Sequence, residues 1–121
     1  MELYPAAIVH GLGDAVAALA RGEPVTLISA PGAALHAGCG WWQTLIEAAR
    51  AAYPDVPCIG ILDCADATGQ ALAALRIGVT RLVLWPEAPG RDAVVAIAAA
   101  AGGFVLPAAP PVNGDKRRRP G

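Results

Sequence analysis

The side chains of this chain that can do chemistry follow its apolar segments. Asp63, Cys64 and Asp66 come directly after the apolar stretch 58–62, and Ser29 ends another such stretch. Carboxylates and a thiol gathered in one place serve acid–base or nucleophilic chemistry, or hold a small ligand. The candidate ligand-binding residues are Asp63, Cys64, Asp66, Cys39, His36, Ser29 and His10. We assign none of them a catalytic role.

Most of these residues also have a purely structural explanation. Asp66 has a side chain that is preferred at helix N-caps, and Asp63 at a strand end is as well suited to bond loop amides as to act in catalysis. Cys64 is expected to be a small buried side chain, and Cys58, inside the apolar stretch, to belong to the core. His10 is expected to be a loop histidine.

Cys39 is the sharpest candidate for a reactive side chain. It stands between Gly38 and Gly40, directly before a predicted helix. A helix start lowers the pKa of a thiol and attracts anions. However, no second cysteine completes a C-x-x-C motif, and no arginine follows at the spacing of a phosphatase loop.

Several well-known sites are excluded because their motifs are missing. The chain lacks the Walker motif G-x-x-x-x-G-K-[ST] and the hydrolase motif G-x-S-x-G. Gly11 and Gly13 begin a dinucleotide fingerprint, but Val16 stands where the third glycine belongs. The histidines and cysteines lack the spacing of a zinc site. The sequence therefore implies no cofactor and no metal.

The elements that must position these residues follow from the apolar pattern. Short, largely β-branched stretches predict strands over 6–9, 25–29, 58–62, 81–85 and 104–106. Apolar residues recurring at three- and four-residue spacing predict helices over 14–21, 41–53, 67–77 and 90–101. In the third helix, Thr68, Leu72 and Leu75 form the expected inner face. The segment 33–40 is either a short helical turn or a loop.

Strict alternation of strands and helices predicts an α/β protein with a parallel sheet. We expect a three-layer α/β/α sandwich with a five-stranded parallel sheet, flavodoxin-like in its strand order 2-1-3-4-5. All strands then end at one edge of the sheet, where such proteins bind ligands. Residues 1–106 form the single domain, and 107–121 form a disordered tail that is Pro-rich and then basic.

The size of the chain, its alternation and an aspartate after the third strand resemble response-regulator receiver domains. That family pairs its phosphorylated aspartate with acidic residues after strand one and a lysine after strand five. Here His10 and Gly11 follow the first strand, and residues 1–113 contain no lysine, so the resemblance implies no phosphotransfer at Asp63. The stretches 29–34, 38–42 and 62–66 are also similar to those of small bacterial α/β proteins without an assigned activity.

The composition bears on the expected partners. Only 16% of the residues are charged and 55% are hydrophobic, which leaves apolar surface for a homodimer contact. Residues 1–113 hold nine acidic residues and five arginines, a net charge of about −4, so we expect no nucleic-acid partner. No stretch predicts a membrane span, and the three cysteines without a signal-like start favour the cytoplasm.

Two functional hypotheses remain open at this stage. The first is a non-catalytic binding or protein-interaction module, because no catalytic constellation is present and apolar surface is in excess. The alternative is a small enzyme or small-ligand-binding protein with its site at the C-terminal edge of the sheet. A small anionic ligand would suit that edge, because the helix N-termini point toward it.

Overall fold

The apolar stretches of the sequence form the strands of one parallel sheet. The computed structural model describes residues 3–112. The strands are β1 (Ala6–Val9), β2 (Val25–Ser29), β3 (Cys58–Asp63), β4 (Arg81–Val83) and β5 (Phe104–Leu106). Three of the five have the predicted bounds, at 6–9, 25–29 and 104–106, whereas β4 ends two residues earlier than expected.

Helices alternate with these strands along the chain. They are α1 (Leu12–Ala20), α2 (Ala33–His36), α3 (Cys39–Ala52), α4 (Thr68–Arg76) and α5 (Arg91–Ala100). The segment 33–40, left open between turn and loop, therefore contains the short helix α2. The expected cap at Asp66 is wrong, because Ala67 precedes α4 and no side chain caps its first turn.

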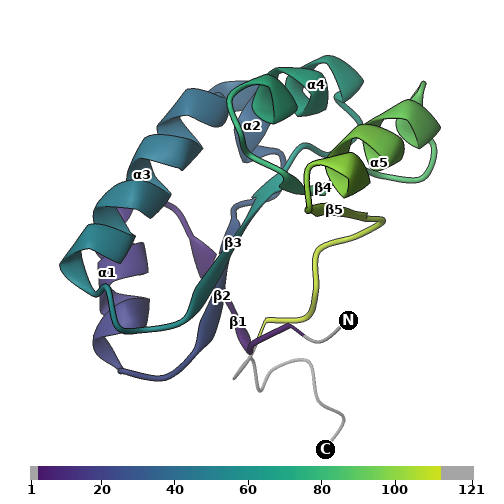
Figure 1. The fold of residues 1–121 in the computed structure, drawn as a ribbon. Coiled ribbons are helices and arrows are strands. Elements are labelled where there is room, and N and C mark those ends of the chain that lie inside the picture. The colour runs from purple at the N-terminus through teal and green to yellow at the C-terminus, as the bar shows by residue number, and fades with distance from the viewer. Residues whose placement is uncertain (1–2, 113–121) are drawn as a thin grey trace, which may run out of the picture.

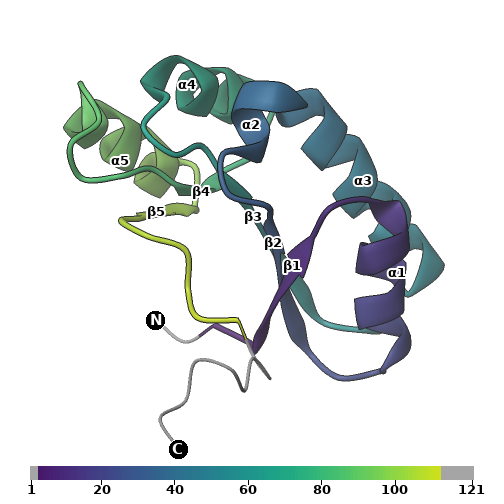
Figure 2. The ribbon, with the colours of Figure 1, turned by 180° about the vertical axis from the view of Figure 1, so that it is seen from behind.

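The strands lie in the sheet in chain order, β1-β2-β3-β4-β5, and every neighbouring pair is parallel. The expected order 2-1-3-4-5 is therefore wrong. That order requires the chain to reverse its direction across the sheet, which sends helices to both faces. Right-handed crossovers that all step the same way keep the helices on one face, as Figures 1 and 2 show. The three-layer sandwich is not confirmed, since the described helices form a single layer.

The main core fills the space between that helical layer and the sheet. Trp42 of α3 is its largest fully buried side chain, and it packs in one cluster with residues such as Leu19, Leu27 and Leu62. In α4 the buried residues are Ala71 and Ala74, not the expected Thr68, Leu72 and Leu75 face. Leu72 and Leu75 are half-buried at the border of the cluster.

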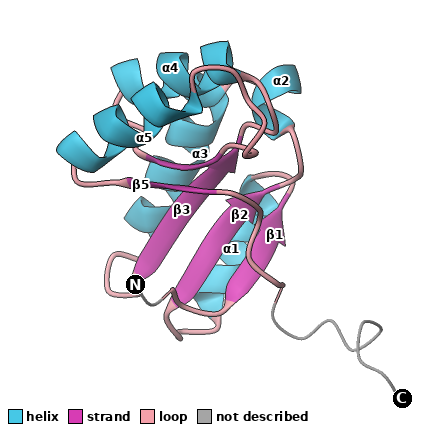
Figure 3. Cartoon of the chain, turned by 90° about the vertical axis from the view of Figure 1, so that its right-hand side faces the viewer, coloured by secondary structure: helices cyan, strands magenta, loops and turns pink. Residues whose placement is uncertain are grey.

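The face of the sheet opposite the helices is also apolar. Ile28, Ile61 and Val83 are buried there as a separate cluster. Figure 3 shows the chain after β5 crossing this face toward β1, and Val112 forms a parallel bridge with Ala6. Residues 107–112 of the expected tail thus lie along the sheet, and 113–121 lie outside the described residues. We call 107–112 the C-terminal strap.

The sheet is uneven, because β3 is longer than its neighbour β4. Residues 58–61 of β3 pair with β2, from Val25↔Cys58 to Ile28↔Ile61. Only Leu62 and Asp63 pair with β4. In the described part of the chain, the N-terminal half of β3 thus has a strand on one side only. No helix among residues 3–112 combines the length and apolar character that crossing a membrane requires.

Candidate functional site

At the C-terminal edge of the sheet, Ser29 and Asp63 hold the backbone together. The Ser29 hydroxyl oxygen accepts the Asp63 N–H at 2.8 Å. The Asp63 carboxylate oxygen Oδ1 accepts the N–H of Ala65 at 2.9 Å and that of Gly32 at 3.3 Å. Asp63 is only 3% exposed. Its carboxylate therefore ties the loop after β2 to the loop after β3, which is the structural role considered for it above.

The tie also fixes an unusual backbone conformation. Ala65 has a φ of 52°, in the left-handed region that side chains with a Cβ disfavour. Its N–H is held by Asp63, and its carbonyl oxygen accepts the Trp85 N–H at 2.8 Å. These bonds on both sides of Ala65 stabilise a turn that would otherwise be strained.

The cysteines do not form a reactive pair. Cys64 is fully buried, and burial is the main reason that its thiol pKa rises to about 12, with smaller contributions from the nearby Asp63 and Cys39 charges. Cys39, the first residue of α3, is half-buried and packs against the main core. Cys58, expected in the core, is half-buried at the start of β3. Cys64 is thus the least accessible of the three thiols.

The remaining sequence candidates lie apart from this cluster. His10 is exposed, and its Nδ1 lies 3.3 Å from Oδ2 of Asp14 in α1. The His10 N–H and this ring contact lower the Asp14 pKa. His36 and Asp66 are exposed. In the described residues, no group of three or more His, Cys, Asp or Glu side chains is placed to hold a metal ion.

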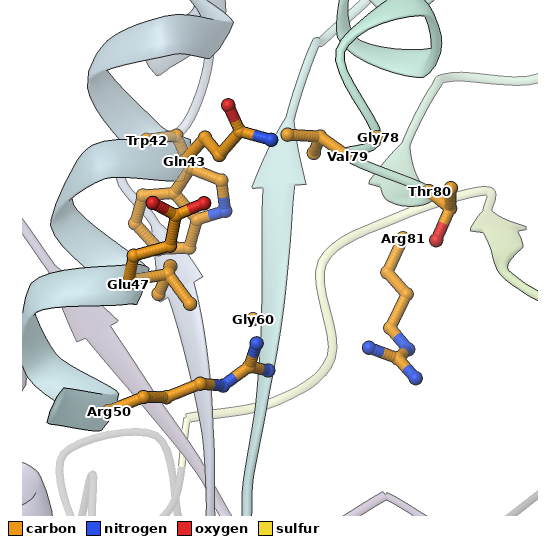
Figure 4. Close-up of a pocket in the computed structure, with 10 residues that line it drawn as sticks. Trp42, Gln43, Glu47, Arg50, Gly60, Gly78, Val79, Thr80 and Arg81 are labelled. Carbon is orange, nitrogen blue, oxygen red and sulfur yellow. The ribbon is translucent and has the colours of Figure 1, made fainter.

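A recess on another part of the molecule has the features of a binding site. It lies between α3, the N-terminal half of β3 and the loop before β4, with a volume of about 140 Å³. Figure 4 shows these residues around the recess, with Gln43 pointing toward Val79, Arg50 extending from α3 toward Gly60, and Arg81 across β3 from the helix. The lining residues are Trp42, Gln43, Ile46, Glu47, Arg50, Gly60, Gly78, Val79, Thr80 and Arg81. None of the seven sequence candidates borders it, and none borders either of two larger hollows near α1, with volumes of about 460 and 410 Å³.

Packing explains how α3 comes to form one wall of this recess. A Cβ at Gly60 would lie 3.1 Å from the Ile46 side chain, so the glycine lets α3 approach β3 closely. The Gln43 amide donates to the carbonyl oxygen of Ile77 and joins the helix to the end of α4. Residues 43, 47 and 50 are spaced by four and three, and therefore share one face of the helix.

Two arginines give the recess a positive character. Arg50 comes from α3 and donates from Nη2 to the Cys58 carbonyl oxygen at 3.2 Å. Arg81 comes from the first position of β4. In the part of the chain that the structure describes, neither guanidinium has a carboxylate within salt-bridge distance, although Glu47 borders the same recess. Unpaired guanidinium groups suit a carboxylate or phosphate, which they bind through two parallel hydrogen bonds.

Sequence reasoning passed over this recess, although two signals pointed to it. An isolated glycine inside a strand, here Gly60, indicates a close approach of another group. The body also has only five arginines, and two of them, Arg50 and Arg81, flank that strand. The distance between α3 and the start of β4 depends on the strand order, and the sequence alone does not give it.

The chain matches no family model, and no curated protein matches it.

Proposed function

We propose that this protein is a non-catalytic binding module that recognises an anionic group in the recess between α3, β3 and β4. The observation that carries the proposal is the pair Arg50 and Arg81, which border one recess without a carboxylate partner among the described residues. Arg50 is exposed and Arg81 is half-buried. Both are open to an external anion, which would supply the counter-charge that neither has among the described residues.

The polar neighbours of the arginines suit recognition. Gln43 and Thr80 offer hydrogen-bonding groups at the border of the recess, and Glu47 carries one negative charge there. The net charge of these side chains is positive, so the site favours a ligand with one or two negative charges. The buried Trp42 forms part of the floor, and a rigid floor limits the entropy lost on binding.

The alternative, an enzyme or ligand site at the C-terminal edge, has less support. Asp63 and Ser29 are already engaged with backbone groups, and Cys64 is buried with a raised pKa. A nucleophile needs a thiolate or an adjacent base. These residues are better explained as supports for the loops.

The proposal is tested by titrating the ¹⁵N-labelled chain with succinate and, separately, with inorganic phosphate. We expect saturable shifts of amide signals confined to residues 43–50, 58–61 and 78–81. The double variant Arg50→Gln with Arg81→Gln should lose these shifts. The matched control is Arg21→Gln, an exposed arginine at the end of α1 that does not border this recess.

The result that would contradict the proposal is equally specific. If neither anion shifts these amides, or if the shifts persist in the double variant, the recess is not an anion site. If the shifts instead gather at residues 29–33 and 63–66, the C-terminal edge is the binding site.

A further inference from the structure

The recess continues into an unpaired stretch of sheet edge. The ladder between β3 and β4 begins only at Leu62, and the Cys64 N–H donates to the Val83 carbonyl oxygen. Alternate residues of a parallel strand direct their backbone groups to the same neighbour. The backbone N–H and C=O groups of Cys58 and Gly60 therefore point to the side of β3 on which β4 lies, where no described strand reaches them. The Cys58 carbonyl oxygen instead accepts a hydrogen bond from the Arg50 side chain.

This stretch has the dimensions of a short strand. Residues 58–61 span about 13 Å at about 3.3 Å per residue, enough to pair with a segment of similar length. Gly60 borders the recess and has no side chain to cover its backbone. Buried or half-buried N–H and C=O groups are nearly always hydrogen-bonded in folded proteins. An added strand would satisfy those of Gly60.

The two arginines indicate which segment fits. Arg50 reaches from α3 to the beginning of this edge, and Arg81 lies beside its far end, as Figure 4 shows. Leu82 packs in the main core on the helix side and Val83 in the cluster on the opposite face, so Arg81 comes from the face opposite to Arg50. Neighbouring residues of an extended segment point to opposite faces, and two of them can therefore each meet one arginine. Acidic side chains match these positions because they carry the charge opposite to that of the arginines. The basic run Lys116–Arg119 of this chain does not match them, because its positive charges would be repelled by Arg50 and Arg81.

Resting on the function proposed above, we propose that the anionic ligand is an extended acidic segment of another protein, which adds as a strand beside residues 58–61 of β3. The backbone of the segment bonds Gly60, and its carboxylates bind Arg50 and Arg81. Main-chain bonds then supply affinity and the arginines supply selectivity, as in other cases of strand addition to a sheet edge.

The test uses the full chain and a fluorescein-labelled hexapeptide with two adjacent glutamates at its centre and valines on either side, so that one glutamate faces each arginine. Binding is followed by fluorescence anisotropy. A second peptide carries glutamine in place of glutamate. A third keeps the glutamates but has N-methylated backbone amides, so that it cannot pair as a strand. We expect the second and third peptides each to bind about tenfold or more weakly than the first. An oligothymidylate of similar charge should bind more weakly than the first peptide.

Variants of the protein connect the binding to the site. Arg50→Gln and Arg81→Gln should each weaken binding of the first peptide by about tenfold, whereas Arg76→Gln, at the end of α4, should not. Circular dichroism checks that the variants are folded. Arg50→Lys keeps the charge and provides a second test, because it should bind the peptide more weakly than the parent chain through loss of the bidentate geometry.

The outcomes separate this inference from the proposed function. If the N-methylated peptide binds as well as the first, strand addition is wrong, while binding of succinate would still support an anion site. If the glutamine peptide binds equally well, or the oligothymidylate binds more tightly, the acidic partner is wrong. Loss of both succinate and peptide binding would overturn both proposals.

Discussion

The hydroxyl oxygen of Ser29 accepts the backbone N–H of Asp63 at 2.8 Å, and this bond joins the ends of two neighbouring strands. Both residues are buried, so if the Ser29 hydroxyl is removed, bulk water does not take its place as the acceptor for the Asp63 N–H. The Asp63 carboxylate extends the connection to Gly32 and Ala65. The polar residues that attract attention in the sequence thus stabilise the loops of the sheet edge.

Removing this connection should destabilise the fold. We expect Asp63→Ala to lower the free energy of unfolding by about 2–3 kcal/mol, because two buried amides lose a charged acceptor. Asp63→Asn keeps an oxygen acceptor and should cost less. The control is Asp66→Ala, an exposed side chain whose loss should change stability by less than about 0.5 kcal/mol. Urea unfolding measures all three, and equal costs at positions 63 and 66 would contradict the assignment.

Two glycines should respond in opposite directions to alanine. A Cβ at Gly103 would overlap the carbonyl group of Thr80, so Gly103→Ala should push β5 away from the start of β4 and destabilise the protein. Gly13 lies within α1 with open space around it. Gly13→Ala should therefore stabilise the helix by about 0.5–1 kcal/mol. Thermal unfolding gives both signs, and a harmless Gly103→Ala would show that the β4–β5 contact is looser than described.

The raised pKa of Cys64 predicts a loss of stability in alkali. The thiol pKa is about 12 in the folded protein against an ordinary value of 9.0, so the folded state holds its proton more tightly than the unfolded state. Stability from this group is complete below pH 9 and falls as the pH rises from 9 toward 12. In Cys64→Ala this contribution is missing. Urea midpoints between pH 8 and 10.5 should therefore fall more steeply for the parent chain than for the variant.

The accessibility of the thiols gives an independent check on the same residue. Cys39 and Cys58 are half-buried and Cys64 is buried. Alkylation followed by mass spectrometry should label Cys39 and Cys58 in the folded chain, and Cys64 only after unfolding. Fast labelling of Cys64 in native conditions would mean that the sheet edge opens readily.

The C-terminal strap should contribute to stability through the sheet face that it crosses. Deleting residues 107–121 removes the segment that crosses the sheet face containing Ile28, Ile61 and Val83, and we expect a lower melting temperature together with self-association. Deleting 113–121 retains every described residue and should leave the melting temperature nearly unchanged. Calorimetry and light scattering compare the two truncations, and equal melting temperatures would show that the strap adds nothing.

A homodimer remains a prediction, now with a specific contact to test. In the alanine-rich helix α5, Ile97 is 46% exposed, at the border of the face that buries Val94 and Ala98. If α5 forms the dimer contact, Ile97→Glu should give a monomer while the parent chain sediments as a dimer. Ala100→Glu, at the end of the same helix, adds the same charge at a less apolar position. A monomeric parent chain at high micromolar concentration would exclude the dimer.

Local patterns in the sequence predicted the elements better than their arrangement. The stretch 25–29 forms a strand because its apolar, β-branched residues suit a buried sheet. Trp42, Leu45, Ile46 and Ala49 form the buried side of α3, as their spacing predicts. The strand order was predicted wrongly because each β-α-β unit has the same local pattern whichever way it steps across the sheet. Its direction depends on contacts between elements distant in sequence.

The same limitation explains the errors at the level of single residues. Leu72 and Leu75 have the more apolar side chains in α4, yet Ala71 and Ala74 occupy its buried face. Adjacent helices in a single layer crowd one another, and small side chains allow their close approach. The recess beside Gly60 was missed for a related reason, because its walls come from α3 and β4 and meet only in the folded chain.

The sequential strand order also has a consequence for how the protein is made. Each strand pairs with the one synthesised just before it, so a chain emerging from the ribosome can add one β-α unit at a time with short loops to close. The bridge between Ala6 and Val112 is different, because it joins the first strand to the last described residue. It can form only after residue 112 has been synthesised. Until then the strap does not cross the face containing Ile28, Ile61 and Val83, and nascent chains on neighbouring ribosomes can contact one another through this apolar face.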